Sequence, residues 1–185
     1  MVETARERPP VAVVAMGDAA RHDDALAMRV MGRVRTLIGE IGCRRLRGEG
    51  DHAPSAAGSL FEWVEGGSDT AQLESVLGSR RRVVLIDAVR LAGRPGTVHH
   101  WHLACAPTSG LTDIRHFNGK PAFGMQHLAL WLEDELPEHG TDFIGLQAFD
   151  FSEGEGLSPP VCRELSAMCS QVAGIVVRIL EDEGW

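Results

Sequence analysis

The sequence predicts an α/β protein, a three-layer α/β/α sandwich around a central, mostly parallel sheet of five strands. Two runs, at residues 11–17 and 82–89, are rich in β-branched residues and almost continuously apolar. Strands of this kind are buried on both faces, as in a parallel sheet covered by helices. Between them, apolar residues recur at intervals of three and four, the period of an amphipathic helix. Such alternation favours a parallel sheet with helices on both faces.

The expected elements follow one another in the order β-α-β-α-β-β-α-β-α. Strands are expected at residues 11–17, 61–65, 82–89, 97–103 and 141–149. Helices are expected at residues 23–41, 70–77, 123–136 and 158–183.

Two helix starts have a recognisable N-cap in the sequence. Ser158 is the expected N-cap of the last helix, because prolines follow it in the first turn, where a missing N–H costs nothing. Asp23 or Asp24 is the expected N-cap of the first helix. A carboxylate accepts hydrogen bonds from the free N–H groups there and suits the positive end of the helix.

The length of 185 residues fits a single domain. We expect a flexible N-terminus at residues 1–10 and one α/β domain at residues 11–185. A stretch rich in Gly, Ala and Ser at residues 44–60 is expected to be a surface loop insertion. A chain of this size buries a core without needing disulfides or a structural metal.

The composition argues against several classes of protein. Lys and Arg number 18 against 26 Asp and Glu, a net charge of −8, whereas nucleic-acid and anionic-lipid binders present basic surfaces. No apolar run reaches the ~18 residues of a membrane span, and the first ten residues lack the apolar stretch of a signal peptide. The four cysteines form no CxxC motif and are expected to be reduced. We therefore expect a cytoplasmic protein that binds neither nucleic acid nor membrane.

Acidic residues mark a candidate site at one edge of the predicted sheet. Asp23 and Asp24 follow the first strand, and Asp87 lies near the end of the strand at residues 82–89. Ligands of open α/β sheets bind at the carboxyl ends of the strands. A carboxylate in an apolar strand is costly to bury unless it is paired or binds a cation. The alternative roles are structural: Asp23 could be a helix N-cap, and Asp87 a carboxylate that accepts hydrogen bonds from loop N–H groups. We favour a functional site because both acidic segments are expected at the same edge of the sheet.

Histidines supply further candidates. His100 and His102 would share one face of a strand and could chelate a metal, although scattered surface histidines are the commoner explanation. His127 lies in the first turns of the helix expected at residues 123–136, near the carboxylates. Cys105 lies close to His102 in the sequence and could form a nucleophile–base pair with it, but no other sequence feature indicates a site there. The sequence contains no GxSxG, HExxH, P-loop or GxGxxG motif.

The motifs, taken in order, resemble those of the hydrogenase maturation endopeptidases. These small cytoplasmic proteases trim the C-terminus of the nickel-loaded hydrogenase large subunit. The segment VVAMGDAARHDDALAMRV resembles the opening motif of this family, with Asp18 in place of the usual Asn and Ala25 in place of the usual Gly. The segment VVLIDAVRLAGRPGTV is the closest match, and FEWVEGG and GLSPPV also fit. The resemblance covers about residues 11–180.

The resemblance implies a nickel-binding triad of two carboxylates and one histidine. The carboxylates correspond to Asp24 and Asp87. Gly124 stands at the position of the family's histidine, and His127 lies three residues later, one helical turn on and on nearly the same face. The resemblance therefore assigns Asp24, Asp87 and His127 as catalytic and metal-binding residues. It leaves open whether Asp23 or a metal-bound hydroxide acts as the base.

The function that the resemblance implies is cleavage of the C-terminal peptide from the precursor of a [NiFe]-hydrogenase large subunit. The nickel would be supplied by this partner protein, and the protease would be a monomer or a weak homodimer. Because Gly124 replaces the family's histidine, the alternative is a non-catalytic hydrogenase assembly chaperone or a nickel-binding protein with the same fold. A third interpretation is a different hydrolase that uses His100 and His102 or Cys105.

Overall fold

The computed structural model describes residues 9–48, 61–67, 76, 80–91, 93–103 and 137–185. Within them, five strands form one sheet in the order β2-β1-β3-β5-β4. The strands are β1 (Val11–Met16), β2 (Phe61–Gly67), β3 (Arg82–Val89), β4 (Val98–Leu103) and β5 (Thr141–Gln147). The helices are the short 3-10 helix η1 (His22–Ala25) and the long helices α1 (Leu26–Gly48) and α4 (Pro159–Asp182). The predicted five-stranded α/β sheet is thus confirmed.

The sheet is parallel except at one edge. Strands β2, β1, β3 and β5 run parallel to their neighbours, and β4 is antiparallel to β5. The turn between β3 and β4 contains Gly96 at a φ of 89°, a conformation that favours glycine. The N–H of Gly96 donates to the carbonyl of Gln147 (2.9 Å), which anchors this turn to the end of β5.

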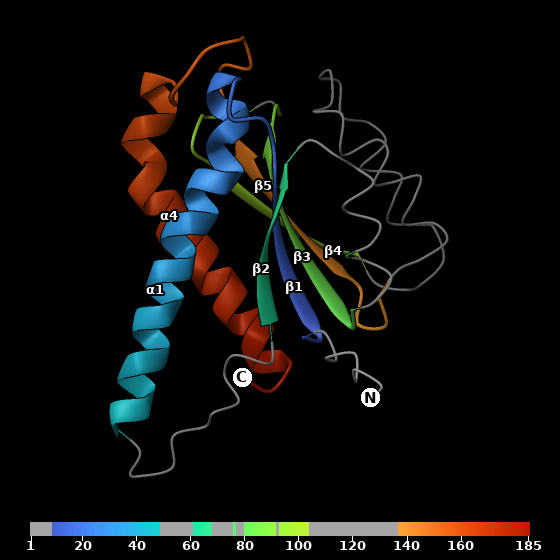
Figure 1. Cartoon of the computed structure of the whole chain (residues 1–185). Helices are drawn as coiled ribbons and strands as arrows, with labels where there is room; N and C mark the ends of the chain where they lie inside the picture. Colours follow the sequence, from blue (N-terminus) through green and yellow to red (C-terminus); the bar gives the residue numbers. More distant parts are fainter. Residues whose placement is uncertain (1–8, 49–60, 68–75, 77–79, 92, 104–136) are drawn as a thin grey trace, which may run out of the picture.

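Helices α1 and α4 lie side by side on one face of the sheet (Figure 1). In α1 the buried apolar residues follow the helical spacing that the sequence predicted: Leu26, Val30, Val34 and Ile38. They pack with α4 and with alternate residues of the strands in one continuous core. The opposite face carries a second apolar cluster that includes the helical residue Val76. Burial on both faces explains why the central strands are almost continuously apolar.

Some expected boundaries differ from the observed ones. Helix α1 continues to Gly48, into the stretch 44–60 that was expected to be a loop, because Arg and Leu at residues 44–47 are good helix formers. The carbonyls of Pro9 and Pro10, within the expected flexible N-terminus, accept hydrogen bonds from Arg80 and Arg81. Residues 49–60, the helix expected at 123–136 and most of that at 70–77 lie outside the described residues. In the described part, no helix has the length and apolarity of a membrane span.

Candidate functional site

The predicted carboxylates lie where the strand order of the sheet reverses. Strand β1 sits between β2 and β3, so the chain leaves β1 toward one neighbour and later returns to its other side. In open α/β sheets this switch point leaves a crevice at the carboxyl ends of the strands, and ligands bind there. Asp24 follows β1 in η1, and Asp87 lies near the carboxyl end of β3. The topology therefore brings two acidic segments to one position.

A tight turn after β1 brings Asp24 back over the end of the strand. Gly17 has a φ of 132°, and a Cβ on it would lie 2.0 Å from the carbonyl oxygen of Asp24. Only glycine fits this approach. The N–H of Asp18 donates to Oδ2 of Asp24 (3.0 Å). Oδ1 of Asp18 accepts from the N–H of Ala20 (2.9 Å), a role that an Asn oxygen would fill equally well, so this departure from the family motif preserves the turn.

Asp87 is a buried carboxylate with few partners. It is 3% exposed, and its Oδ1 accepts one hydrogen bond, from the N–H of Ala88 (2.8 Å). Within the described part of the chain it forms no ion pair. Burial, and secondly the negative charge of Asp24, raise the pKa of Asp87 to about 7. Asp87 therefore exchanges its proton near neutral pH.

Asp24 responds to the same surroundings but is more accessible. It is half-buried, and burial is the main cause that raises its pKa, opposed by the hydrogen bond from Asp18. Because the negative charge of Asp24 helps to raise the pKa of Asp87, a cation between the two carboxylates would favour their charged forms.

Apolar side chains lie close to the residue that pairs with Asp87 on β5. Gly145 is its register partner on β5, and a Cβ on Gly145 would lie 2.8 Å from the Trp101 ring and 3.1 Å from the methyl groups of Val89. A glycine at this position lets the Trp101 ring pack close to β5, the strand that pairs with β3 at Asp87. This apolar environment explains why burial dominates the pKa shift of Asp87.

The remaining predicted ligand is not placed. His127 and Gly124, together with His116 and Cys105, lie outside the described residues. Within the described ranges, no group of three or more His, Cys, Asp or Glu side chains is arranged to hold a metal ion. Two carboxylates offer only part of a coordination shell.

The prediction that Asp23 or Asp24 is the N-cap of the first helix is wrong. Arg21 occupies the N-cap position of η1, and no side chain forms a cap hydrogen bond there. The Asp23 carboxylate is 0% exposed and accepts its hydrogen bonds from the distant segments at residues 149–150 and 158. The same burial argues against Asp23 as the base, because it has no access to a substrate. Ser158 is the N-cap of α4 as predicted, although its hydroxyl bonds to Asp23 instead of to its own helix.

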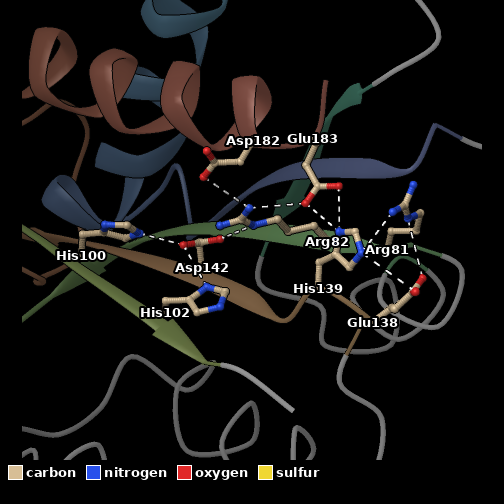
Figure 2. A network of polar contacts seen from close by, with 9 residues as sticks. All are labelled: Arg81, Arg82, His100, His102, Glu138, His139, Asp142, Asp182 and Glu183. Carbon is tan, nitrogen blue, oxygen red and sulfur yellow. Dashed lines mark hydrogen bonds and ion pairs between the residues drawn. The ribbon is translucent and has the colours of Figure 1, made fainter. Parts of the chain in front are cut away.

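The histidine pair on β4 belongs to a structural network (Figure 2). As predicted, His100 and His102 share a face, and both rings contact Oδ1 of the buried Asp142, His100 through Nε2 (2.8 Å) and His102 through Nδ1 (3.3 Å). Arg82 Nε donates to Oδ2 of Asp142 (2.8 Å). This network lies at the amino end of β3 and β5, away from Asp87. The pair therefore lies apart from the candidate site at Asp24 and Asp87.

The network continues to the end of α4. Arg82 also pairs with Glu183 (3.4 Å), whose carboxylate contacts Nδ1 of His139 (2.8 Å). Figure 2 shows these contacts joining the first residue of β3 to the C-terminal end of the last helix. The network thus fastens α4 to the sheet at the end opposite to the candidate site.

His99 points to the other face of β4. Its ring stacks on Trp101 with a centroid distance of 5.5 Å and an interplanar angle of 12°. Burial lowers the pKa of His99, so the ring is neutral at neutral pH. Its Nε2 is buried without a hydrogen-bond partner in the part of the chain that the structure describes.

Replacing Asp142 by Ala is expected to lower the free energy of unfolding by about 3 kcal/mol, because it leaves the largely buried Arg82 without its closest partner. Asp182→Ala is the matched control, since Asp182 is 70% exposed and lies 3.9 Å from the same guanidinium. We expect it to change stability by less than about 0.5 kcal/mol. Urea denaturation measures both values, and equal effects would show that the network is not structural.

The Asp142 network was missed at the sequence level, although two signals for it are present. Asp142 is the one acidic residue in the mostly apolar strand at residues 141–147, as Asp87 is in the strand at residues 82–89. Arg82 begins a neighbouring apolar strand with the opposite charge. The pairing depends on β3 and β5 being neighbours, which the sequence does not state.

Comparison with known proteins finds similarity in structure alone. No family model matches the chain, and no curated protein matches it. The hydrogenase maturating endopeptidase HybD from E. coli superposes with a TM-score of 0.60 at 17% identity, covering 94% of this chain and 93% of that one. The [NiFe] hydrogenase maturation protease HybD from Thermococcus kodakarensis gives 0.59 at 20% identity, covering 92% and 98%.

A third solved structure, the [NiFe] hydrogenase maturation protease HycI from Thermococcus kodakarensis KOD1, gives a TM-score of 0.52 at 16% identity, with 93% of this chain and 94% of that chain covered. At these identities the comparison establishes the fold. The resemblance seen in the sequence motifs is therefore confirmed in three dimensions, and the chain has the fold of the hydrogenase maturation endopeptidases.

Proposed function

We propose that this protein is a cytoplasmic endopeptidase of [NiFe]-hydrogenase maturation. It would recognise nickel in the precursor of the large subunit and cleave off the C-terminal peptide. The observation that carries the proposal is the pair Asp24 and Asp87, two carboxylates at the switch point of a sheet whose fold is shared with maturation proteases.

The electrostatics of the pair suit a cation that arrives with the substrate. Asp87 is largely protonated below pH 7, and a nearby positive charge would favour its ionised form. Binding would then release a proton, and affinity for the nickel-loaded precursor would rise with pH. Without the ion, the like charges of Asp24 and Asp87 oppose each other. The site would thus distinguish a loaded precursor from an empty one.

The proposed reaction uses the ion that the precursor carries. Asp24 and Asp87 would complete its coordination from one side, and the ion would polarise the scissile carbonyl or activate a water molecule. Holding the peptide against the rim of the sheet would lower the entropic part of the barrier. Because Asp23 is fully buried, a water or hydroxide on the ion remains as the candidate base.

The third contact is proposed to be His127. We expect His127→Ala to slow precursor cleavage more than His116→Ala or His100→Ala, since His127 would supply the imidazole that nickel prefers. His100 is already hydrogen-bonded to Asp142, so its variant controls for loss of a histidine elsewhere. Cleavage is followed by the mass of the large subunit. Wild-type rates in all three variants would show that the imidazole is dispensable or comes from another residue.

The direct test uses the purified full-length protein and a [NiFe]-hydrogenase large-subunit precursor from the same organism, prepared with and without nickel. The proposal expects mass spectrometry to show loss of the C-terminal peptide from the nickel-loaded form alone. Binding without trimming would contradict the protease and favour the chaperone. Absence of both binding and trimming would reject a role in hydrogenase maturation. Light scattering of the same sample tests the proposed monomer or weak homodimer.

A further inference from the structure

The buried carboxylate of Asp23 joins two segments that are distant in the sequence. Its Oδ2 accepts hydrogen bonds from the N–H groups of Phe149 (2.9 Å) and Asp150 (2.9 Å) and from the hydroxyl of Ser158 (2.6 Å). Its Oδ1 accepts from the N–H of Ser158 (2.7 Å). A carboxylate that is 0% exposed is stable only when both oxygens are satisfied in this way.

The backbone around Asp23 is bound to the same segment. The N–H of Asp23 donates to the carbonyl of Asp150 (3.0 Å), and the N–H of His22 donates to that of Gly154 (2.9 Å). The N–H of Gly154 donates in return to Ala20 (2.9 Å). The acidic loop is thus hydrogen-bonded on several sides to the segment between β5 and α4.

The conformation of His22 shows that these contacts impose the path of the loop. His22 has a φ of 26°, in the left-handed region that non-glycine residues rarely adopt. Its Nδ1 lies 3.0 Å from the carbonyl oxygen of Gly156, and a Cβ on Gly154 would lie 2.2 Å from its Nε2. A strained residue persists where its surroundings hold it in place. This strained residue stands directly before the acidic pair.

Asp24 has little of its own to hold it in position. Among the described residues, its carboxylate accepts one hydrogen bond, from Asp18, and its N–H donates to the carbonyl of Arg21 (2.7 Å). Both partners belong to the same loop, so they move with it. The loop is fixed to the segment between β5 and α4 by the backbones of Ala20 and His22, by the Arg21 guanidinium, which donates to the carbonyl of Phe151 (3.1 and 3.3 Å), and by the Asp23 carboxylate. The Asp23 carboxylate is the anchor directly before Asp24 in the chain, so we expect it to affect the direction of the Asp24 side chain most.

We propose that Asp23 is a positioning residue, which clamps the loop to the segment before α4 and so places the Asp24 carboxylate opposite Asp87. The inference rests on the proposed function for its catalytic consequence, but the clamp itself is a property of the free protein. Asp23→Asn is an informative variant because the amide has nearly the same shape. Its NH₂ group would replace one acceptor oxygen and oppose a backbone N–H donor.

The test measures amide hydrogen exchange in the ¹⁵N-labelled full-length protein. The N–H of Asp18 reports the position of Asp24, because it donates to the Asp24 carboxylate. We expect Asp23→Asn to speed exchange at Asp18 by roughly tenfold or more, the effect of losing about one hydrogen bond. Exchange at Ile86, in the buried centre of β3, should not change.

Three further variants complete the experiment. Asp24→Ala removes the acceptor for the Asp18 N–H, so it gives the largest increase in the exchange rate of Asp18 that loss of this bond can cause. Asp150→Asn is the control, because among the described residues its carboxylate forms hydrogen bonds only with Ser152 and none with Asp23. Ser158→Ala removes one bond to Asp23 and no cap bond of α4, so it serves if Asp23→Asn does not fold. We expect a smaller but measurable effect at Asp18 from Ser158→Ala.

One result would overturn the proposal: in Asp23→Asn, exchange is faster at Phe149 and Asp150 but unchanged at Asp18. The hydrogen bonds of Asp23 would then be broken while Asp24 stays in place. The second readout is precursor cleavage, where kcat/KM should fall at least about tenfold, because Asp24 would contact the ion of the precursor both on binding and during cleavage. A kcat/KM equal to that of the wild type would show that Asp23 does not position Asp24. If the wild-type protein cleaves no precursor, the proposed function fails while the exchange data still decide the clamp.

Discussion

The Asp87→Asn variant is expected to leave the hydrogenase precursor uncut while it keeps the wild-type fold. Burial already favours the uncharged carboxyl at this position, and an amide is uncharged and of nearly the same size. The variant loses the negative charge that would face the ion of the precursor. Loss of a charge partner at a reacting centre typically costs about a hundredfold to a thousandfold in rate. Mass spectrometry of the large subunit after a fixed time measures the loss.

Asp182→Asn is a suitable control for this experiment. It makes the same chemical change at an exposed carboxylate near the end of α4, remote from the switch point of the sheet. We expect it to process the precursor at the wild-type rate. A normally processed precursor in the presence of Asp87→Asn would defeat the assignment of Asp87 to the site.

Asp87 is also expected to make the protein less stable as the pH rises. Its pKa increases from the ordinary value of 3.8 to about 7 in the folded protein. Between these values the folded state binds more protons than the unfolded state, so the free energy of unfolding falls with rising pH. The fall amounts to at most about 4 kcal/mol and is complete above the folded pKa. Asp87→Asn should therefore be more stable than the wild type at pH 8.

The measurement is urea denaturation of both proteins at pH 4 and pH 8. At pH 4 the Asp87 carboxyl is protonated in the folded state, so the two proteins should have similar stability. Comparing the difference between them removes the contribution of every other titrating group that is unaffected by the change. An Asp87→Asn protein that is equally or less stable than the wild type at pH 8 would show that the pKa of Asp87 is not raised.

The elements that were predicted best are those whose burial is complete. The strands at residues 11–16 and 82–89 are apolar on both faces, and helix α1 carries its apolar residues at regular intervals. In these segments the composition of each stretch alone is enough to recognise the element. The end of α1 was placed too early, because the regular apolar spacing in the sequence stops at Ile41, whereas the helix continues to Gly48.

The neighbours of each strand could not be inferred in the same way. The order of elements along the chain is visible, but β4 pairs with β5 and not with β3, which precedes it. That choice creates the Asp142 network, in which His102 meets a carboxylate 40 positions away. Alternation along β4 predicted that His100 and His102 share a face. It could not predict their buried partner Asp142, which lies on another strand.

The acidic residues Asp23, Asp24 and Asp87 were also predicted only in part. Asp24 and Asp87 were recognised as site candidates because carboxylates are unusual at the ends of apolar strands. The part played by Asp23 was misjudged, because its partner Ser158 lies 135 positions away in the sequence. Apolar periodicity is a local property of a segment, so it predicts helices, strands and the sheet edge where ligands bind. Hydrogen bonds and shifted pKa values depend on which distant groups become neighbours, and folding alone brings those groups together.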